Sequence, residues 1–499
     1  MTSSHSPTRL SISRLFRALV FLAFLLEGFL ALIFILDASV PGTTILIAAL
    51  VGTILFAAIV WLSLRANPRA ASAETTTSGK NQLAVVILVG LIVRVCWLVL
   101  VPPVQVSDYQ RYLNAARNLL ANRVYVEDIQ GHIFHAFTPP GLPMVLAGGL
   151  WIFGDHAWTP GILNLIFFVL SSFLIAAIAN RIFGRRAAIL SVCLFAIWPS
   201  YVALTGMAAS EPLFVFLLLG ACFFLFLAPG AALQWSPICG VAAGLATLTR
   251  PTALTLPVLW IAAILLLGLK REWIKSVAIA TVFLAVTIAP WTIRNYRVFG
   301  TFVAVSTNGG DVFYRSNNPL ATGSWTARGE RDLSAYMENE VSWNKTGFAW
   351  GKDWVRTHPM EFLKLAIRKE FIFLGSDETG VYWAIERTHP EWSVADRVGK
   401  AVSDLWWLGI WGLLLVALIL HRREGLEIPQ TLCLLLPFLY FAGIHSIFES
   451  QERYHIPAVP FLLIAAALAF TRNRLRSGQE TPKGTISGES SRAEQTSAA

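Results

Sequence analysis

Long apolar segments recur along almost the whole chain, and few folds can accommodate so many of them. A helix needs about 20 apolar residues to cross the hydrocarbon core of a membrane. About twelve segments approach that length: 17–36, 43–64, 83–101, 158–180, 187–207, 212–228, 237–250, 252–269, 275–293, 404–420, 428–447 and 455–471. Apolar residues make up 55% of the 499 residues and charged residues only 14%, whereas a soluble chain carries about 25% charged residues. This composition excludes a soluble enzyme, a disordered protein and a disulfide scaffold, and it predicts an all-α polytopic membrane protein.

The positions of lysine and arginine predict how these spans are oriented. Short basic stretches precede the first span and follow the second, fourth, eighth, tenth and twelfth spans. Because such stretches stay in the cytoplasm, we expect the even-numbered spans to end there and both termini to be cytoplasmic. These topology residues account for the formal net charge of +9, so nothing indicates a nucleic-acid partner.

Two segments then face the opposite side, and both are too long to be simple connections. The first outer loop, 102–157, contains a short apolar run at 141–153, which we expect to lie as a helix in the outer interface because it is too short to span. The polar segment 294–403 predicts a small extracytoplasmic part. The chain therefore divides into five parts: an N-terminal pair of spans with its linker (66–80) at 1–82, a membrane core at 83–293, the extracytoplasmic region at 294–403, C-terminal spans at 404–476, and a tail at 477–499 that we expect to be disordered.

Asp108 and Glu211 are the two acidic residues that could carry chemistry at this outer side. Asp108 comes shortly after the third span, at the start of an amphipathic stretch. Glu211 stands at the start of the sixth span. The simpler interpretation makes each acid the cap of a helix, because both positions begin a helix. The functional interpretation is that both acids converge on one outer pocket, where Asp108 acts as a base.

Three arginines are expected at the same side. Arg250 lies between two apolar spans with almost no loop, Arg294 directly follows the ninth span, and Arg453 directly precedes the last one. Each alone is explained as an interface anchor whose guanidinium reaches water. Beside two acids, the three together indicate a phosphate site, because guanidinium binds phosphate oxygens bidentately. Arg94, in the middle of the third span, needs a partner inside the membrane, and Glu27 is a candidate.

Three residues before the last span have a spacing that is compatible with a metal site. His445, Glu449 and Glu452 recur at helical spacing and therefore share one helical face, an arrangement that could hold a divalent metal. An ordinary polar patch at the end of a span is the simpler interpretation. His445 and Glu449 are therefore only weak metal candidates, no cofactor is assigned, and a divalent metal is left open.

The order of several short motifs resembles a known family. They are VSDYQRYLNAARNLL in the first outer loop, FTPPGLPMVLAGGLWIFG and NRIFGRRAAILSVCLFAIWPS after it, and ASEPLFVFLLL, GLATLTRPTAL, PWTIRNYRVFGTFVAVSTNGG and RYHIPAVPFLL further on. Over roughly 83–472 the chain resembles the bacterial branch of the dolichyl-phosphate-mannose protein mannosyltransferase superfamily. The resemblance implies a GT-C fold, a bundle of about twelve transmembrane helices with interfacial helices and a small extracytoplasmic part.

The resemblance also implies roles for individual residues. The family's catalytic aspartate falls on Asp108, and its second acidic position falls on Glu211. Beyond the resemblance, we expect Arg250, Arg294 and Arg453 to bind the donor phosphate, because cations stabilise its growing charge, and Tyr109 and Tyr112 to bind substrate. In one respect the chain departs from the related aminoarabinose transferases: Thr138 precedes Pro139-Pro140, where those enzymes have a metal-binding glutamate, so zinc binding is not carried over.

We therefore expect an inverting glycosyltransferase, a hexosyl- or pentosyltransferase that moves a sugar from a polyprenyl-phosphate donor to an acceptor hydroxyl on a glycan, lipid or protein. Such an enzyme would lie in the inner membrane of a bacterium, in contact with bilayer lipid, with its active site on the periplasmic or extracellular side. The alternative is a transporter or flippase of a lipid-linked sugar, which twelve spans and the intramembrane Arg94 also fit. The sequence leaves the sugar, the acceptor and the metal dependence open.

Overall fold

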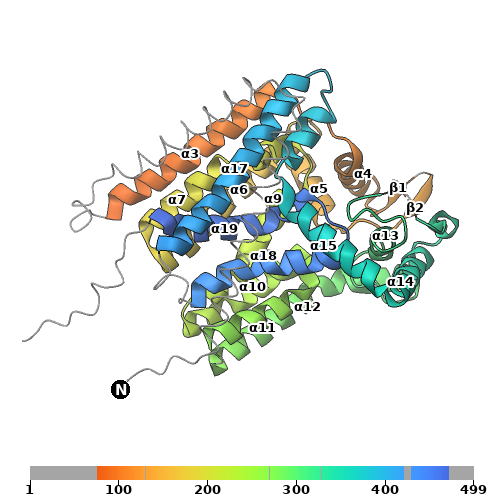
Figure 1. Ribbon diagram of the computed structural model, residues 1–499. Coiled ribbons are helices and arrows are strands. Elements are labelled where there is room, and N and C mark those ends of the chain that lie inside the picture. Colours follow the sequence, from red (N-terminus) through yellow and green to blue (C-terminus); the bar gives the residue numbers. More distant parts are fainter. Residues whose placement is uncertain (1–75, 130, 269, 327–328, 421–428, 471–499) are drawn as a thin grey trace, which may run out of the picture.

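The computed structural model describes residues 76–129, 131–268, 270–326, 329–420 and 429–470. Helices dominate this part of the chain (Figure 1), and its one sheet is an antiparallel hairpin of β1 (Glu127–Ile129) and β2 (His132–Phe134). The predicted spans at 17–36 and 43–64, most of the linker and the tail at 477–499 lie outside the described residues. The last residues of the predicted linker, 76–80, already belong to a helix, because α3 runs from Thr76 to Leu100.

The membrane bundle follows the predicted spans. All ten predicted spans that fall on described residues coincide with helical structure. Within the described ranges, seven helices are long and apolar enough to cross a membrane. They are α3, α6 (Thr159–Phe183), α10 (Pro229–Thr249), α12 (Arg271–Phe299), α17 (Ser393–Leu420), α18 (Pro429–Ile447) and a last span built from η7 (Glu452–Tyr454), η8 (Ile456–Ala458), α19 (Val459–Ala466) and η9 (Ala467–Phe470). The chain is therefore a multi-pass membrane protein.

Shorter apolar helices complete the bundle. They are α7 (Arg185–Ala196), α8 (Pro199–Ala203), η2 (Leu204–Gly206), α9 (Ser210–Cys222), η3 (Phe223–Phe226), η4 (Pro251–Thr255) and α11 (Leu256–Leu267). The predicted span at 187–207 is broken, because α7 and the α8–η2 segment meet at an angle of 57°. Pro199 contributes to the break, since it has no backbone N–H to continue the helical ladder.

Arg94 of α3 stabilises this break. Its guanidinium donates hydrogen bonds to the carbonyls of Ala196 at 2.8 Å and Phe195 at 3.3 Å, at the end of α7. The last carbonyls of a helix have no partner within the helix and favour a positive charge. Arg94 therefore finds partners in the main chain of α7, whereas Glu27, the partner suggested from the sequence, lies outside the described residues.

Small residues let α10 and α12 approach each other closely. A Cβ at Gly240 of α10 would stand against the carbonyl oxygen of Ala280 of α12, and a Cβ at Gly244 would stand against the side chain of Thr287. Small residues four positions apart commonly form such contacts between membrane helices. This contact fixes the position of α10, and therefore that of Arg250, which directly follows its last turn.

Both predicted outer segments lie at one end of the bundle, at the right in Figure 1. The first outer loop forms α4 (Ser107–Asn122), the hairpin and α5 (Gly141–Phe153), which has the bounds of the predicted interfacial helix. The second segment forms α13 (Gly309–Arg315), η5 (Leu333–Tyr336), α14 (Glu340–Thr357), α15 (Pro359–Gly375), α16 (Thr379–Val381) and the π-helical turn η6 (Tyr382–Glu386). Within the predicted region 294–403, α12 continues to Phe299 and α17 already begins at Ser393.

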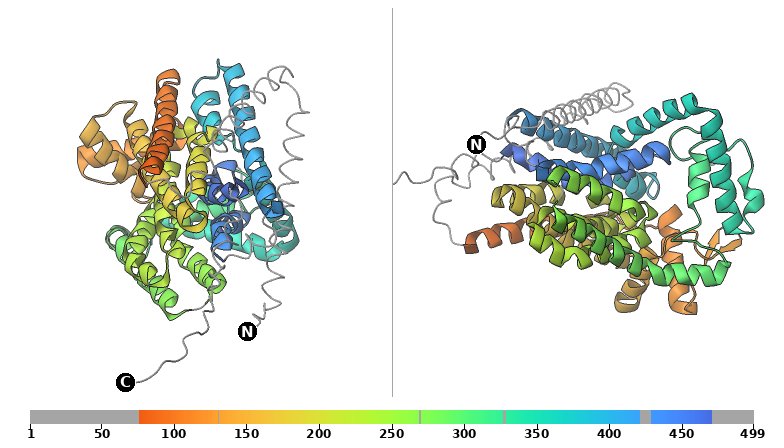
Figure 2. Two further views of the ribbon diagram at one scale, coloured as in Figure 1. Left: turned by 90° about the vertical axis from the view of Figure 1, so that its left-hand side faces the viewer. Right: turned by 90° about the horizontal axis from the view of Figure 1, so that it is seen from below.

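The two outer segments are joined by a buried glutamate. Glu340, the first residue of α14, accepts hydrogen bonds from the backbone N–H groups of His135 at 2.6 Å and Ala136 at 3.1 Å, directly after β2. It also accepts one from the hydroxyl of Thr307 at 2.6 Å. The right-hand view in Figure 2 likewise shows α14 beside the hairpin. The outer end is therefore one packed structure of the two loops.

Candidate active site

Asp108 is the second residue of α4, and its carboxylate does not cap that helix. Val106 occupies the cap position and makes no side-chain capping bond, so the cap interpretation of Asp108 is wrong. The carboxylate instead accepts from Nη2 of Arg111 at 2.5 Å and from Nη2 of Arg453 at 3.5 Å. Ser107, directly before it, has a φ of +53°, a strained left-handed value for a residue with a Cβ, and such strain concentrates at functional sites.

The arginines keep Asp108 ionised. Burial alone raises the pKa of the Asp108 carboxyl, but the positive charges of Arg453 and Arg111 outweigh burial, and the pKa lies below its ordinary value. Arg315 acts in the same direction. A carboxylate that is charged at neutral pH is able to accept a proton from a substrate.

Arg453 is positioned by the residue that follows it by two places. His455 is fully buried, with its Nδ1 2.8 Å from the carbonyl oxygen of Phe373 and its Nε2 3.2 Å from Oδ1 of Asp377. The ring of Trp407 stacks on it with 4.5 Å between ring centroids. These contacts fix η7, the first turn of the last span, and therefore hold Arg453 beside α4.

Glu211 and Arg250 form a pair at the start of α9. Oε1 of Glu211 lies 2.5 Å from Nη2 of Arg250, and Nε of Arg250 donates to the hydroxyl of Ser210 at 2.9 Å. Ala209 occupies the cap position of α9 without a side-chain bond, so Glu211 is not the cap either. Glu211 is almost completely buried, and Arg250 provides its counter-charge.

Tyr109 and Tyr112 differ in how far they are exposed. Tyr109 is buried, with its ring edge-on to Trp383, and its hydroxyl has no hydrogen-bond partner. The charges of both Glu211 and Asp108 act on this phenol, so both acids lie around it. Tyr112 is partly exposed. Burial raises the pKa of Tyr112 to about 12, so its hydroxyl stays protonated and can donate a hydrogen bond.

Arg294 has other partners. Its guanidinium donates to the carbonyl oxygens of His135 at 2.7 Å and Tyr125 at 3.0 Å, and it lies over the ring of Trp291. It therefore ties α12 to the ends of the hairpin. The structure brings Asp108 and Arg453 into contact, places the Glu211–Arg250 pair near them, and does not bring Arg294 to this group.

The weak metal candidates are engaged in other contacts. Nδ1 of His445 lies 2.7 Å from the carbonyl oxygen of Glu449, and its ring stacks on Tyr454. The carboxylate of Glu449 accepts from Gln451 at 2.6 Å and from the Tyr454 hydroxyl at 3.1 Å. In the part of the chain that the structure describes, no three His, Cys, Asp or Glu side chains are placed to hold a metal ion.

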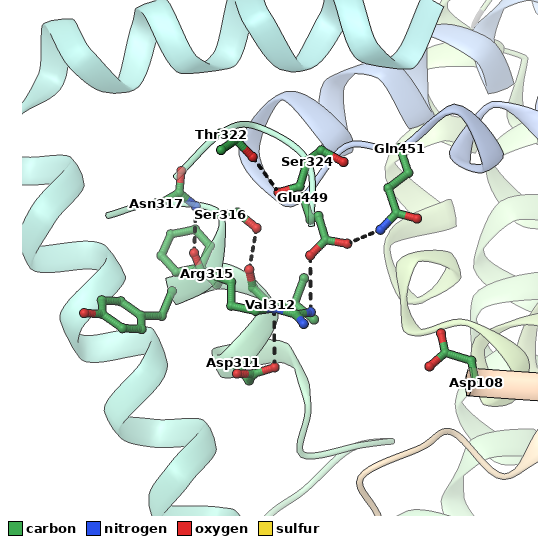
Figure 3. A network of polar contacts seen from close by, with 12 residues as sticks. Asp108, Asp311, Val312, Arg315, Ser316, Asn317, Thr322, Ser324, Glu449 and Gln451 are labelled. Carbon is green, nitrogen blue, oxygen red and sulfur yellow. Dashed lines mark hydrogen bonds and ion pairs between the residues drawn. The ribbon is translucent and has the colours of Figure 1, made fainter. Parts of the chain in front are cut away.

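Three charged residues near Asp108 were not predicted from the sequence: Arg111, Asp311 and Arg315. Arg111 follows Asp108 by three positions, and opposite charges at that spacing on a helix are a local signal that points to it. Arg315 and Asp311 lie on α13, in the second outer segment. Nη2 of Arg315 is 3.2 Å from Oε2 of Glu449, and its Nε is 3.5 Å from Oδ2 of Asp311. Figure 3 shows that Asp108 points toward this group.

Comparison with known proteins supports the resemblance noted in the sequence. Residues 138–293 match the family model described as dolichyl-phosphate-mannose-protein mannosyltransferase. This match lies within the stretch over which the motifs resemble that superfamily, and it confirms the resemblance there. No curated protein is a significant match to the chain.

Solved structures establish the fold. The oligosaccharyltransferase of Archaeoglobus fulgidus matches in its apo form with a TM-score of 0.50 at 14% identity, over 79% of this chain and 50% of that chain. The same enzyme tethered to an acceptor peptide with the NVT sequon matches with a TM-score of 0.50 at 16% identity, over 79% and 49%. This chain has the GT-C fold. It spans about half the length of the oligosaccharyltransferase.

One further solved structure is reported for comparison. ArnT from Cupriavidus metallidurans, solved with bound undecaprenyl phosphate, matches with a TM-score of 0.41 at 15% identity, over 78% of this chain and 75% of that chain.

Proposed function

We propose that this protein is an inverting glycosyltransferase that moves a sugar from a polyprenyl-phosphate donor to an acceptor hydroxyl at the outer face of the membrane. The observation that carries the proposal is the ionised carboxylate of Asp108, held between Arg111 and Arg453 where α4 meets the last span. The GT-C fold supports it. So does the family model matched by residues 138–293, whose description names dolichyl-phosphate-mannose.

In this proposal Asp108 is the base. The oxygen of the acceptor hydroxyl attacks C1 of the donor sugar and forms the new bond, while its proton passes to the carboxylate of Asp108. The bond between C1 and the phosphate oxygen breaks, and its electron pair leaves with the lipid phosphate. Because the base and the leaving group lie on opposite faces of the sugar, the configuration at C1 is inverted.

Arg453 and Arg250 are the proposed ligands of the donor phosphate. Arg453 lies 3.5 Å from the carboxylate of Asp108, a loose contact that a phosphate can replace. A phosphate that draws Arg453 away also weakens one of the charges that lower the pKa of Asp108. Donor binding would therefore make Asp108 a stronger base. Arg294 is left out of the proposal, because its guanidinium is bound to main-chain carbonyls.

Glu211 is a positioning residue in this proposal. Its carboxylate holds the guanidinium of Arg250, and the same arginine is bound to Ser210. Two partners on one side leave the other side of the guanidinium for the donor. Cations so placed would stabilise the negative charge that grows on the leaving phosphate.

The proposed location follows from the chemistry of the donor. Its isoprenoid chain stays in lipid while its head group meets water, and the site lies at the end of the bundle where the two outer loops pack together (Figure 1). In the proposal the protein lies in the inner membrane of a bacterium, and this end faces the periplasm or the exterior.

A transfer assay in detergent tests the proposal against the transporter alternative. Purified protein is incubated with a radiolabelled polyprenyl-phosphate sugar and a panel of acceptors, and the lipid phosphate and the labelled product are separated. Detergent abolishes vectorial transport and leaves transfer intact. Release of lipid phosphate together with a labelled product supports the proposal. Intact donor in detergent, combined with movement of the donor across the membrane of proteoliposomes, would contradict it and favour a flippase.

A further inference from the structure

A group of charged side chains faces Asp108 from the second outer segment and from the short loop after α18. Arg315 is its centre, with Glu449 at 3.2 Å on one side and Asp311 at 3.5 Å on the other. We call Asp311, Arg315 and Glu449 the outer cluster. Figure 3 shows the carboxylate of Asp108 pointing toward the outer cluster from the opposite side, and the charge of Arg315 lowers the pKa of Asp108. The two groups therefore belong to one site.

This site contains an unusual number of buried polar atoms without a hydrogen bond. Nε of Arg111, Nε of Arg315 and Oε2 of Glu449 make no hydrogen bond but lie within ion-pair distance of Glu127, Asp311 and Arg315, respectively. Oγ of Ser450, Nε of Arg453 and the hydroxyl of Tyr109 have neither a hydrogen bond nor an ion pair. Glu449 is only 2% exposed and Ser450 is fully buried. Buried polar groups are almost always hydrogen-bonded in folded proteins, and an unsatisfied set indicates a missing ligand or water. The atoms without either kind of partner are two hydroxyls and one guanidinium N–H, and Tyr109 and Arg453 both lie close to the proposed base.

The charges of the site favour an uncharged ligand. Arg111 and Arg453 face Asp108, and Arg315 faces Asp311 and Glu449, so each of these guanidinium groups already has a carboxylate partner. The donor phosphate would bring one more negative charge. A second anionic group at this place would find no unpaired cation among these residues, and repulsion would oppose its binding.

A hydroxyl group fits this arrangement, because it donates one hydrogen bond and accepts others. Sugars present several hydroxyls together with an apolar face of C–H groups. Trp325 offers a matching surface: its ring lies 5.9 Å from the guanidinium carbon of Arg315, and 57% of the residue is exposed. An amphipathic aromatic ring beside polar groups is typical of sites that bind such ligands.

We propose that the outer cluster binds the acceptor and that the acceptor is an uncharged sugar. The inference rests on the proposed function. Glu449 and Asp311 accept hydrogen bonds from sugar hydroxyls, Arg315 donates to a sugar oxygen, and the reacting hydroxyl is left beside Asp108. As this hydroxyl attacks C1 of the donor sugar, its proton goes to Asp108 and the electron pair of the broken bond goes to the lipid phosphate.

The first test compares two acceptors that differ only in charge. Octyl glucoside and octyl glucuronide are offered to the purified full chain with a radiolabelled polyprenyl-phosphate hexose, and a threonine-containing peptide is a third arm. We expect transfer to octyl glucoside to exceed transfer to the glucuronide by about tenfold or more. Preferred transfer to the glucuronide or to the peptide overturns the inference. Release of the labelled sugar to water without any acceptor is measured in parallel, and the absence of both transfer and release in every arm overturns the proposed function and with it the inference.

The second test changes the outer cluster. Glu449→Gln and Asp311→Asn each weaken a hydrogen bond to the acceptor, so we expect the KM for octyl glucoside to rise about tenfold. The KM for the donor and the release of sugar to water should stay unchanged, which a general loss of structure would not allow. Asp155→Asn is the matched control, because Asp155 forms an exposed ion pair with Arg117 at 2.7 Å elsewhere on the outer surface. Equal effects on donor and acceptor KM in the two cluster variants overturn the inference.

Discussion

Oδ2 of Asp108 lies 3.5 Å from Nη2 of Arg453, although 345 positions of sequence separate the two residues. Asp108 lies in the first turn of the first helix of the first outer loop, and Arg453 lies in the first turn of the last span. The contact forms only when the complete bundle is assembled. The proposed base and a proposed phosphate ligand therefore come from opposite ends of the catalytic region and are held in place by different helices.

Arg453→Lys should lower kcat/KM for the donor by about a hundredfold, because an ammonium group keeps the charge and loses the planar, bidentate geometry that suits phosphate. Transfer is measured at several donor concentrations to separate the KM for the donor from kcat. Arg117→Lys is the control, since Arg117 is exposed and pairs with Asp155. A variant at position 453 with unchanged kinetics would show that Arg453 does not bind the donor.

Arg111→Gln should move the acidic limb of the pH profile of kcat/KM to higher pH. Burial raises the pKa of Asp108, and Arg453 and Arg111 together lower it further than burial raises it. Asp108 is therefore ionised at neutral pH, and activity that depends on its carboxylate is lost only as the pH falls through this lowered pKa. Removing the charge of Arg111 raises the pKa of Asp108, so the acidic limb of the kcat/KM profile moves to higher pH.

The contribution of Asp108 to folding stability depends on pH in the same direction as its contribution to activity. The ion pair of Asp108 is a stabilising contribution above the pKa of the unfolded chain, about 3.9, and it is lost as the pH falls through the folded value. An acidic limb that stays in place in Arg111→Gln means that Arg111 does not set the charge of Asp108.

The Glu211–Arg250 pair should act as a unit in stability. Glu211 is only 1% exposed, so Glu211→Gln leaves Arg250 without its counter-charge, and breaking one partner of a buried pair costs about 3 kcal/mol or more. Glu211→Gln, Arg250→Gln and the double variant are compared by thermal unfolding in detergent. We expect the double variant to be less destabilised than the sum of the single variants. Additive effects would mean that the two side chains do not interact.

Gly240→Val should destabilise the bundle by separating α10 from α12, because the new side chain meets the carbonyl oxygen of Ala280. The expected result is a lower melting temperature and a smaller monodisperse fraction. Gly148→Ala in α5 is the control, since a Cβ there meets nothing within 4 Å and alanine favours a helix by about 1 kcal/mol over glycine. A Gly240→Val protein as stable as Gly148→Ala would contradict the close packing of the two helices.

Much of the fold could be predicted because burial in lipid leaves a strong hydropathy signal. The helix at 141–153 was predicted with the bounds that α5 has. The break in the span at 187–207 was not predicted, because apolar length does not show where a helix bends. Pro199 was a local hint, but the angle also depends on Arg94, which lies about a hundred positions earlier and binds the end of α7.

The candidate site was harder to predict, because the partners of its charges are distant in sequence. Asp108 and Arg453 were both singled out, and the structure brings them together. Arg294 was placed with them because all three lie at the outer side, but main-chain carbonyls of the hairpin take its guanidinium. Nothing local in the sequence marks such main-chain partners. Arg315 was not predicted for a related reason: it lies in a polar outer segment, where charged residues are common and a single arginine gives no signal.

Asp108→Asn tests the central claim most directly. The amide has the size of the carboxylate and cannot take the proton of the acceptor, so release of lipid phosphate coupled to product should fall about 10²–10⁴-fold. Membrane insertion, melting temperature and donor binding should remain near those of the wild type, and Asp155→Asn, prepared in parallel, should keep full activity. Turnover of Asp108→Asn close to the wild-type rate would contradict the account, because Asp108 would then not be the base.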